Sequence, residues 1–294
     1  MKTAIIGGDK RMLYAAKAFS DDGAEVAAAG FDNLQSLCDI RVMSVKEALK
    51  WADFSVLPVR PVDGGCINMP YAAEKITLHD FARMNGAKPV FSGFSESIAN
   101  AITAPVCDYA AREEFAVRNA VLTAEGAVAL LINEYEDSVS GAKALVIGYG
   151  RIGKVLSRYL QSLGAEVTVA ARKPSDRAWI EAVGMAADNY SYKELSSYQI
   201  VFNTVPAPVL DAACIDRLRD DVMLIDLASA PGGVDFDRAG ERGLTCIHAL
   251  GLPGKSAPKA AGRIIKDTII HIIKEENGGK DYSGLCDDRL LLHL

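Results

Sequence analysis

The sequence predicts an α/β protein with two doubly wound parallel-sheet domains, joined by a long helix and separated by a cleft. The first observation is length, because 294 residues at roughly 150 per domain give about two domains. The second is an internal repeat, in which residues 3–12 and 23–33 resemble residues 143–153 and 164–174. The third is the alternation of strand and helix patterns after each repeat, which is typical of parallel sheets with right-handed crossovers.

Composition excludes several classes of protein. Half of the residues are hydrophobic and 24% are charged, as in a folded globular chain. The net charge of −6 opposes general binding to nucleic acid or to an anionic membrane. The six cysteines form no CxxC pair, so neither a zinc ribbon nor a dense disulfide framework is indicated. A cytoplasmic protein is expected, with neither signal peptide nor membrane span, since Arg118 and Glu125 interrupt the most apolar stretch, 115–132.

The first half begins with a strand at Thr3, a glycine-rich turn, and a helix that ends before Gly23. Apolar residues recur in this helix at helical spacing. Further strands are expected at 55–59 and 89–92.

The second half repeats this order more clearly. The short apolar run 144–147 is typical of a parallel strand that is buried on both faces. The next helix carries one apolar stripe, and Gly164 provides its left-handed stop. The stripe consists of Ile152, Val155, Leu156, Tyr159, Leu160 and Leu163. Further strands are expected at 200–204, 223–227 and 245–249.

A long helical pattern from Asp108 to Asn133 separates the halves. We therefore expect a flavodoxin- or Rossmann-like substrate domain at 1–115 and a connecting helix at 116–136. A Rossmann domain that binds NAD(P) should follow at 137–275, closed by a helix over 259–275. The tail 276–294 is a candidate arm of a homo-oligomer.

The strongest motif is the run Gly148-Tyr149-Gly150-Arg151-Ile152-Gly153, which follows a buried strand and opens an amphipathic helix. The first glycine permits the tight turn, the second lets the backbone approach a diphosphate, and the third lets helix and strand pack closely. We expect Gly148, Gly150, Arg151, Ile152 and Gly153 to bind the coenzyme at the helix N-terminus. The alternative is a glycine turn in a domain that binds no nucleotide.

The strand after this helix ends without the carboxylate that usually binds the ribose 2′-hydroxyl of NAD. Arg172 and Lys173 stand there instead. A guanidinium can pair with a 2′-phosphate, so NADP is favoured over NAD. The alternative is that Arg172 is a solvated loop charge.

The segment Asn203-Thr204-Val205-Pro206 follows the fourth strand of the second half. Ligands bind at the carboxyl ends of strands in open sheets, so we expect these residues to lie beside the nicotinamide riboside. An ordinary turn is the alternative, because Asn and Pro are common turn residues.

Residues 226–233 and 251–259 follow the next two strands. Asp226 is a candidate proton acceptor and Ser229 a candidate substrate ligand. Lys259 lies in the first turn of a helix, where a carboxylate would be stabilised. An exposed lysine with no ligand is an equal alternative.

In the first half, Arg11 follows the turn at 7–8 and is a candidate ligand for a second carboxylate, with a surface arginine as the alternative. The turn lacks a third glycine, which argues against a second dinucleotide there. Ser92 and Gly93 end another strand and are expected at the substrate site. Glu125 is a second candidate base, and its neighbour Gly126 indicates close approach of a ligand or of another helix.

Other chemistries have little support. The four histidines have no metal-ligand spacing, so no metal is expected, and neither a GxSxG nor a GxxxxGK[ST] motif occurs. His248 ends a strand and is either an acid or, more simply, a packed side chain.

Seven segments together resemble the family of the dipicolinate synthase A subunit over about residues 3–275. They are GGDKR at 7–11, FSGFS at 91–95, TAEG at 123–126, GYGRIG at 148–153, NTVP at 203–206, DLASAPGG at 226–233 and GLPGKSAPKAAG at 251–262. The second half alone is similar to the nucleotide domains of 2-hydroxyacid dehydrogenases.

This resemblance implies oxidation of a dihydrodipicolinate, derived from 4-hydroxytetrahydrodipicolinate by loss of water, to dipicolinate during sporulation. It also implies a partner, the dipicolinate synthase B subunit, and action in the mother-cell cytoplasm. Aromatisation of the ring would draw hydride transfer forward, so protein groups need only orient the small dicarboxylate and accept a proton. Two alternatives stay open: another NADP-linked dehydrogenase of a small carboxylic acid, and a noncatalytic nucleotide-binding chain that regulates the B subunit.

Overall fold

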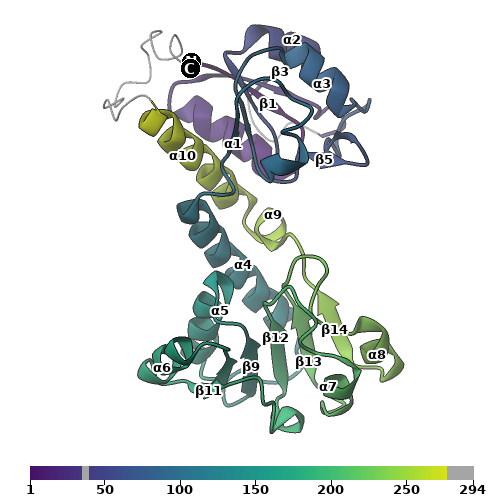
Figure 1. Ribbon diagram of the computed structural model, residues 1–294, viewed down its shortest axis with the longest axis vertical. Coiled ribbons are helices and arrows are strands. Elements are labelled where there is room, and N and C mark those ends of the chain that lie inside the picture. Colours follow the sequence, from purple (N-terminus) through teal and green to yellow (C-terminus); the bar gives the residue numbers. More distant parts are fainter. Residues whose placement is uncertain (35–39, 277–294) are drawn as a thin grey trace. The chain divides into compact units, whose positions relative to one another are not determined.

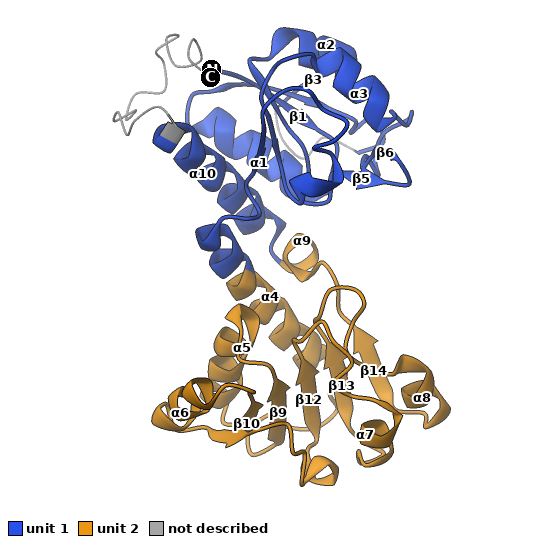
Figure 2. Ribbon diagram, viewed as in Figure 1, with its two compact units in different colours: residues 1–119, 257–294 blue, residues 120–256 orange. Residues whose placement is uncertain are grey.

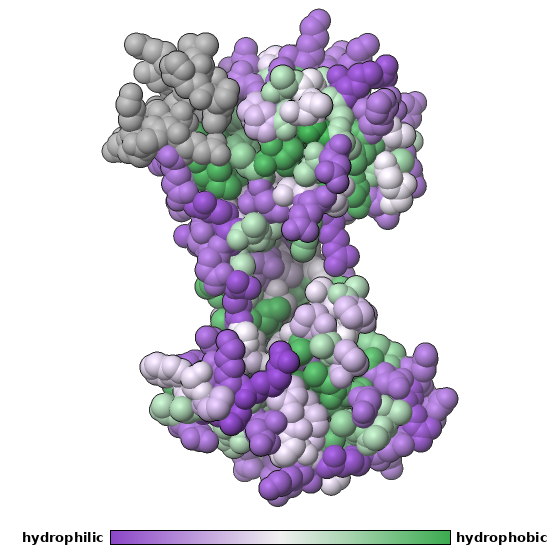
Figure 3. Space-filling model, viewed as in Figure 1, coloured by the Kyte–Doolittle hydropathy of each residue, from purple (hydrophilic) through white to green (hydrophobic). Residues whose placement is uncertain are grey.

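The computed structural model describes residues 1–34 and 40–276. The chain forms two compact units (Figure 2). Unit 1 consists of residues 1–119 together with the C-terminal residues from 257, and unit 2 consists of residues 120–256. On the face shown in Figure 3, hydrophilic residues cover much of the outer surface of both units.

Unit 1 contains a six-stranded parallel sheet in the order β3-β2-β1-β4-β7-β8 (Figure 1). Its strands are β1 (Lys2–Ile6), β2 (Glu25–Ala29), β3 (Arg41–Val42), β4 (Phe54–Val56), β7 (Val90–Ser92) and β8 (Val106–Asp108). Its helices before residue 100 are α1 (Lys10–Asp21), α2 (Val45–Trp51), α3 (Leu78–Asn85) and the 3₁₀ turn η1 (Ser95–Ser97). A small antiparallel hairpin, β5 (Val62–Asp63) and β6 (Cys66–Ile67), lies between β4 and β7 in the chain.

Unit 2 contains a second six-stranded parallel sheet, in the order β11-β10-β9-β12-β13-β14. Its strands are β9 (Lys143–Ile147), β10 (Glu166–Ala170), β11 (Ala186–Asp188), β12 (Ile200–Asn203), β13 (Met223–Asp226) and β14 (Thr245–His248). Its helices are α5 (Arg151–Ser162), α6 (Pro174–Ala182), η2 (Leu195–Ser197), α7 (Ala212–Asp216), α8 (Phe236–Glu241) and α9 (Leu252–Ser256).

Both sheets have the doubly wound order in which the first and fourth parallel strands are central neighbours. The predicted fold class of two Rossmann-like parallel-sheet domains is therefore confirmed. Strand β9 shows why: Ala144 and Val146 are buried in the core on one face of the sheet, and Leu145 and Ile147 in the core on the other. An apolar run with both faces buried requires helices on both sides of the sheet.

The long helix α4 runs from Glu113 to Glu134, and the boundary between the units falls within it. The expected start at Asp108 is wrong, because residues 106–108 pair with β7 as an edge strand. The Asp108 carboxylate accepts hydrogen bonds from the backbone N–H groups of Ser95, Ala110 and Ala111 and so fixes the turn before the helix. Among the described helices, α4 is the one with the length and apolar character of a membrane span, but nearly half of its apolar stretch is buried inside the protein, as in a core helix.

The C-terminal helix α10 (Pro258–Glu276) belongs to unit 1, which corrects the expectation that it closes the second domain at 137–275. Ile265 and Ile269 are buried in the same core as Met12 and Phe19 of α1. Helical spacing identifies an apolar face, but it does not identify which of two similar sheets that face will cover.

Gly262 lets α10 approach α1 closely. A Cβ atom at this position would lie 2.6 Å from the backbone oxygen of Arg11 and 2.6 Å from the nitrogen of Ala15. Further along the helices, the Lys266 ammonium pairs with Asp22 just beyond the end of α1. The two helices therefore run in the same direction, with their N-terminal ends together.

We expect Gly262→Ala to destabilise the protein by about 1–3 kcal/mol, because the backbone of α1 must move to admit the methyl group. Gly240→Ala in α8 is the matched control, since a Cβ there meets no atom within 4 Å. The control should be neutral or stabilising by up to about 1 kcal/mol. Urea unfolding monitored by circular dichroism measures both, and equal stability of the two variants would contradict the packing described for α10.

Candidate functional site

The glycine turn between β9 and α5 lies at the switch point of the unit 2 sheet, where β9 and β12 are neighbours. Gly148 has φ +101°, and a Cβ there would lie 2.4 Å from Thr204 Oγ1. A Cβ at Gly153 would lie 2.1 Å from the backbone oxygen of Gly148. Close packing within the protein therefore explains these two glycines.

The close packing that explains Gly148 and Gly153 does not explain why residue 150 is glycine. A Cβ there would meet no protein atom within 4 Å, so packing within the described structure does not exclude a side chain. Gly150 is also the N-cap of α5, and as a glycine it has no side chain to cap the first N–H groups of the helix. Open space before an uncapped N-terminus fits a diphosphate, which would contact the turn through Gly150 and the first helical residues Arg151 and Ile152.

Two exposed cations follow β10 at the same edge of the sheet. Arg172 and Lys173 are exposed, and Lys173 is the N-cap of α6. Nearby, Arg177 Nη1 donates hydrogen bonds to the backbone oxygens of Ala171 and Arg172, at 3.0 and 2.7 Å. Arg177 therefore stabilises the loop, while no ion pair joins Arg172 to a carboxylate in the part of the chain that the structure describes.

The loop after β12 is held in place by its own first residues. Asn203 is fully buried; its Oδ1 accepts a hydrogen bond from the N–H of Val205, and its Nδ2 donates to the backbone oxygen of Val205. Thr204 Oγ1 donates to the backbone oxygen of Ile147 at 2.8 Å, which joins this loop to the glycine turn. Pro206 follows on the surface. The four residues predicted to lie beside the nicotinamide riboside thus share one loop next to Gly148.

Asp226 is buried in the interior of unit 2 and is not open to a ligand, as a base would have to be. Its side chain is fully buried, and Oδ1 accepts hydrogen bonds from Asn203 Nδ2 at 2.8 Å and from the Ala228 N–H at 2.9 Å. Oδ2 accepts one from the N–H of Gly233 at 3.1 Å. The carboxylate therefore holds the loops after β12 and β13 together, and we withdraw its predicted role as proton acceptor in favour of a positioning role.

The other predicted residues of unit 2 are accessible. Ser229 is exposed on the loop after β13, and Glu125 is exposed on α4. His248 stacks against Phe236 and places Nε2 3.2 Å from the backbone oxygen of Ala228. Gly126 is explained by helix packing, because a Cβ there would lie 2.8 Å from Ser256 Oγ in α9.

Unit 1 carries the other predicted substrate ligands. Arg11 lies in the first turn of α1 and is already paired: its Nε and Nη2 donate to the Asp9 carboxylate at 2.8–3.0 Å. Asp9 also caps the helix by accepting a hydrogen bond from the Arg11 N–H. Asp9 therefore satisfies one of the N–H groups at the start of α1 that would otherwise lack a partner within the helix. Lys259 is exposed one turn before Gly262, at the same end of the helix pair as Arg11.

Ser92 and Gly93 end β7 in the interior of unit 1. Ser92 is fully buried, and its Oγ donates to the backbone oxygen of Gly93 at 2.9 Å. A Cβ at Gly93 would lie 2.5 Å from the backbone oxygen of Val59, so packing against the loop after β4 accounts for this glycine. The Ser92 hydroxyl is therefore used internally, which argues against its predicted contact with substrate.

The first glycine turn is covered by its own domain. Met69 follows the β5–β6 hairpin, and its side chain would lie 2.4 Å from a Cβ at Gly7 and 2.7 Å from one at Gly30. Gly8 donates its N–H to the backbone oxygen of Asn68 at 2.8 Å. Protein atoms thus pack against Gly7 and Gly8 of this turn, and the N-cap position that corresponds to Gly150 of unit 2 is Asp9.

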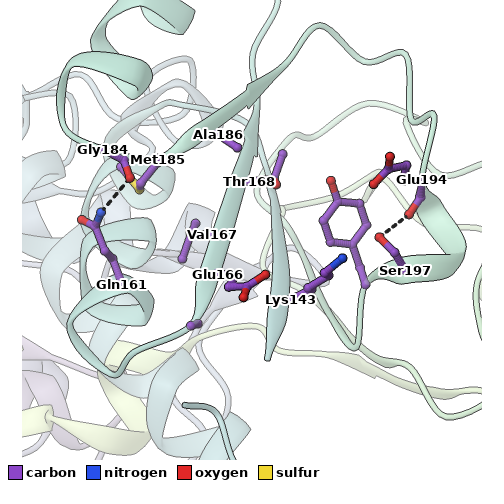
Figure 4. A pocket seen from close by; sticks show the side chains of 12 residues that line it. Lys143, Gln161, Glu166, Val167, Thr168, Gly184, Met185, Ala186, Glu194 and Ser197 are labelled. Atoms are coloured by element: carbon purple, nitrogen blue, oxygen red, sulfur yellow. Dashed lines mark hydrogen bonds between the residues drawn. The ribbon is translucent and has the colours of Figure 1, made fainter. Parts of the chain in front are cut away.

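A separate pocket of about 370 Å³ lies at the amino end of the unit 2 sheet (Figure 4). Its lining includes Lys143, Gln161, Glu166, Glu194 and Tyr198. Lys143 and Glu166 begin β9 and β10, so this pocket opens at the edge opposite to the glycine turn. It does not belong to the predicted site. The described residues contain no group of three His, Cys, Asp or Glu side chains arranged for a metal ion.

Comparison with known proteins adds independent information. Residues 2–106 match the family model of the N-terminal domain of the dipicolinate synthase A subunit. Residues 119–232 match that of the D-isomer specific 2-hydroxyacid dehydrogenase NAD binding domain. The A subunit of dipicolinate synthase from Bacillus subtilis (strain 168) is 30% identical over 94% of this chain and 96% of its own.

Solved structures agree. The crystal structure of the dipicolinate synthase A subunit from Bacillus halodurans has a TM-score of 0.83 at 31% identity and covers 92% of this chain and 97% of its own. The Bacillus subtilis structure has a TM-score of 0.82 at 29% identity, with coverage of 94% and 97%. A transhydrogenase from Sinorhizobium meliloti, with TM-score 0.65 at 16% identity over 93% of this chain and 94% of its own, shares the fold. The chain therefore belongs to the family of the dipicolinate synthase A subunit, and its unit 2 is a dehydrogenase-type domain for a nicotinamide dinucleotide.

Proposed function

We propose that this chain catalyses the NADP-dependent oxidation of a dihydrodipicolinate, formed from 4-hydroxytetrahydrodipicolinate by loss of water, to dipicolinate in sporulating cells. The observation that carries the proposal is the open N-terminus of α5 at Gly150, in a chain of this family. The family membership supports the substrate, and the open turn supports a bound diphosphate.

The coenzyme would be held by backbone groups of the turn 148–153, with the loop 203–206 beside the nicotinamide riboside. NADP is proposed over NAD because Arg172 and Lys173 are exposed cations at the carboxyl end of β10. The nearest strand-end carboxylate, Asp188, is engaged elsewhere: it accepts hydrogen bonds from the N–H and the hydroxyl of Ser191, each at 2.8 Å. A 2′-phosphate would thus meet the positive charges of Arg172 and Lys173, while both oxygens of Asp188 accept hydrogen bonds from Ser191.

When bound, an oxidised nicotinamide supplies the hydride acceptor. The substrate loses one hydride and one proton, and the products are dipicolinate, NADPH and a proton. Arg11 and Lys259 would bind the two carboxylates, with Asp9 fixing the Arg11 guanidinium through two of its nitrogens. Glu125 is exposed and stays the proposed proton acceptor, while Ser229 would bind substrate from the loop that Asp226 positions.

The chain would act with the dipicolinate synthase B subunit in the mother-cell cytoplasm and assemble as a homo-oligomer. We expect the tail 276–294 to be an oligomer arm. Residues 277–294 lie outside the described residues. Neither nucleic acid nor a membrane is proposed as a partner, given the net charge of −6.

Gly150→Ala and Gly150→Ser should weaken NADP binding roughly tenfold or more, because a side chain displaces the phosphate from charge-assisted N–H bonds. Gly150→Ser should keep its stability, since the Cβ enters open space and Ser is a good N-cap, whereas Gly150→Ala should lose about 1 kcal/mol because Ala is a poor N-cap. Isothermal titration calorimetry and thermal unfolding measure the two effects. Wild-type affinity in both variants would exclude a coenzyme on this turn.

Arg172→Ala should lower the affinity for NADP about tenfold and leave the affinity for NAD nearly unchanged, because the guanidinium contacts only the 2′-phosphate. Arg158→Ala, which removes an exposed arginine of α5, is the control. Dissociation constants for both coenzymes measure the effect. Tighter binding of NAD than of NADP by the unaltered chain would refute the NADP assignment.

The purified chain, with and without the B subunit, should form NADPH from NADP and freshly prepared substrate, as measured by ultraviolet absorbance. Lys259→Ala should raise KM roughly tenfold with NADP affinity unchanged, because one carboxylate loses its charge partner. Lys255→Ala, an exposed lysine of α9, is the control. Absence of NADPH under both conditions would favour a noncatalytic role, and equal loss of substrate and coenzyme binding in Lys259→Ala would indicate misfolding.

A further inference from the structure

The turn that follows β11 contains two tyrosines in a backbone conformation that side chains rarely adopt. Tyr190 has φ +69° and Tyr192 has φ +49°. Non-glycine residues in the left-handed region persist only where the surrounding structure holds them there, and they cluster at ligand sites. The two tyrosines are therefore candidates for contact with a ligand.

Three interactions hold the turn. The Asp188 carboxylate accepts hydrogen bonds from the N–H and hydroxyl of Ser191 at 2.8 Å and from the N–H of Tyr192 at 3.4 Å. Tyr192 is 7% exposed and is buried in the core below the turn. The Tyr190 ring lies against it, with ring centroids 5.7 Å apart. The position of the Tyr190 ring is thus fixed from below, and part of the residue stays exposed.

Strand register places Tyr190 beside Arg172. Ala170 pairs with Asp188 in the parallel ladder, and the Ala171 N–H extends the pairing to the backbone oxygen of Asp188 at 2.9 Å. Arg172 and Tyr190 each lie two residues beyond that pair. Burial raises the pKa of Tyr190 and the positive charge of Arg172 opposes the rise, as expected for close neighbours.

The Tyr190 ring also shares a face of the sheet with the coenzyme loop. Tyr190, Val205 and Val209 all pack, half-buried, against the same core. Val205 is in the loop that contacts Gly148, so the ring, the cation and the phosphate turn are all at the carboxyl edge of this sheet.

We infer that Tyr190 is a coenzyme-binding residue, whose ring stacks on the adenosine part of the coenzyme while Arg172 binds the 2′-phosphate. This inference rests on the proposed function. The recognised chemical group is an adenosine 2′,5′-bisphosphate. An aromatic ring in contact with a purine and a guanidinium in contact with a phosphate are both favourable and use different parts of that group.

The test uses Tyr190→Gly, Tyr190→Phe and calorimetric titration of the full chain with NADP, NAD and adenosine 2′,5′-bisphosphate. Tyr190→Gly should weaken binding of all three ligands about tenfold, the loss expected when a base loses its stacking partner. Glycine adopts φ +69° without strain, which offsets part of the packing lost with the half-buried ring, and thermal unfolding checks that the variant is folded. Tyr190→Phe should bind within about twofold of the unaltered chain, since the ring is kept.

Tyr198→Ala is the matched control, because this half-buried tyrosine lines the pocket at the opposite edge of the sheet. It should bind all three ligands normally. Wild-type affinity in folded Tyr190→Gly would overturn the inference alone. If the unaltered chain binds none of the ligands, both the inference and the proposed function are wrong. If it prefers NAD but Tyr190→Gly weakens both coenzymes, the stacking role stands and the NADP assignment is wrong.

Discussion

The buried carboxylate of Asp226 holds together the two loops on which the coenzyme edge of unit 2 depends. It accepts hydrogen bonds from the Asn203 amide and from two backbone N–H groups, and it is fully shielded from solvent. A buried polar side chain is costly to remove from water unless it is hydrogen-bonded, and these three hydrogen bonds meet that requirement. Because Asn203 also bonds Val205, and Thr204 bonds Ile147, the constraint extends to the glycine turn. The loops after β12 and β13 and the glycine turn are therefore joined in one hydrogen-bonded network.

The two units share a strand order and use it differently. In unit 2 a Cβ at Gly150, the N-cap of α5, would enter open space, so this helix start is accessible to an anion. In unit 1 the equivalent N-cap of α1 is Asp9, whose carboxylate accepts the Arg11 N–H and pairs with the Arg11 guanidinium. The same topology thus has a helix start that suits a diphosphate in unit 2 and one that already holds a carboxylate in unit 1.

The two units also differ in how their cationic side chains are paired. Unit 2 presents Arg172 and Lys173 without a paired carboxylate among the described residues, which suits an anionic ligand of permanent charge. In unit 1 the Asp9 carboxylate has two roles: it caps α1 through the Arg11 N–H, and it orients the Arg11 guanidinium. Gly262 brings the start of α10, and with it Lys259, to the same end as the start of α1. A small dicarboxylate would find two cations presented from two adjacent helix starts.

Local signals in the sequence were sufficient for the elements that carry the coenzyme turn. The run 144–147, the glycine turn and the stripe of α5 as far as Leu160 are specified by periodicity and by glycine stereochemistry and lie where they were predicted, whereas Leu163 is the exposed C-cap of the helix. Arg172 follows its strand as expected. Three other features are seen only in the tertiary structure. Helix α10 packs on unit 1, the surrounding loops bury Asp226, and Tyr190 lies beside Arg172. Each of these depends on which distant segments pack together, and short edge strands such as β11 contain too few residues to indicate their partner.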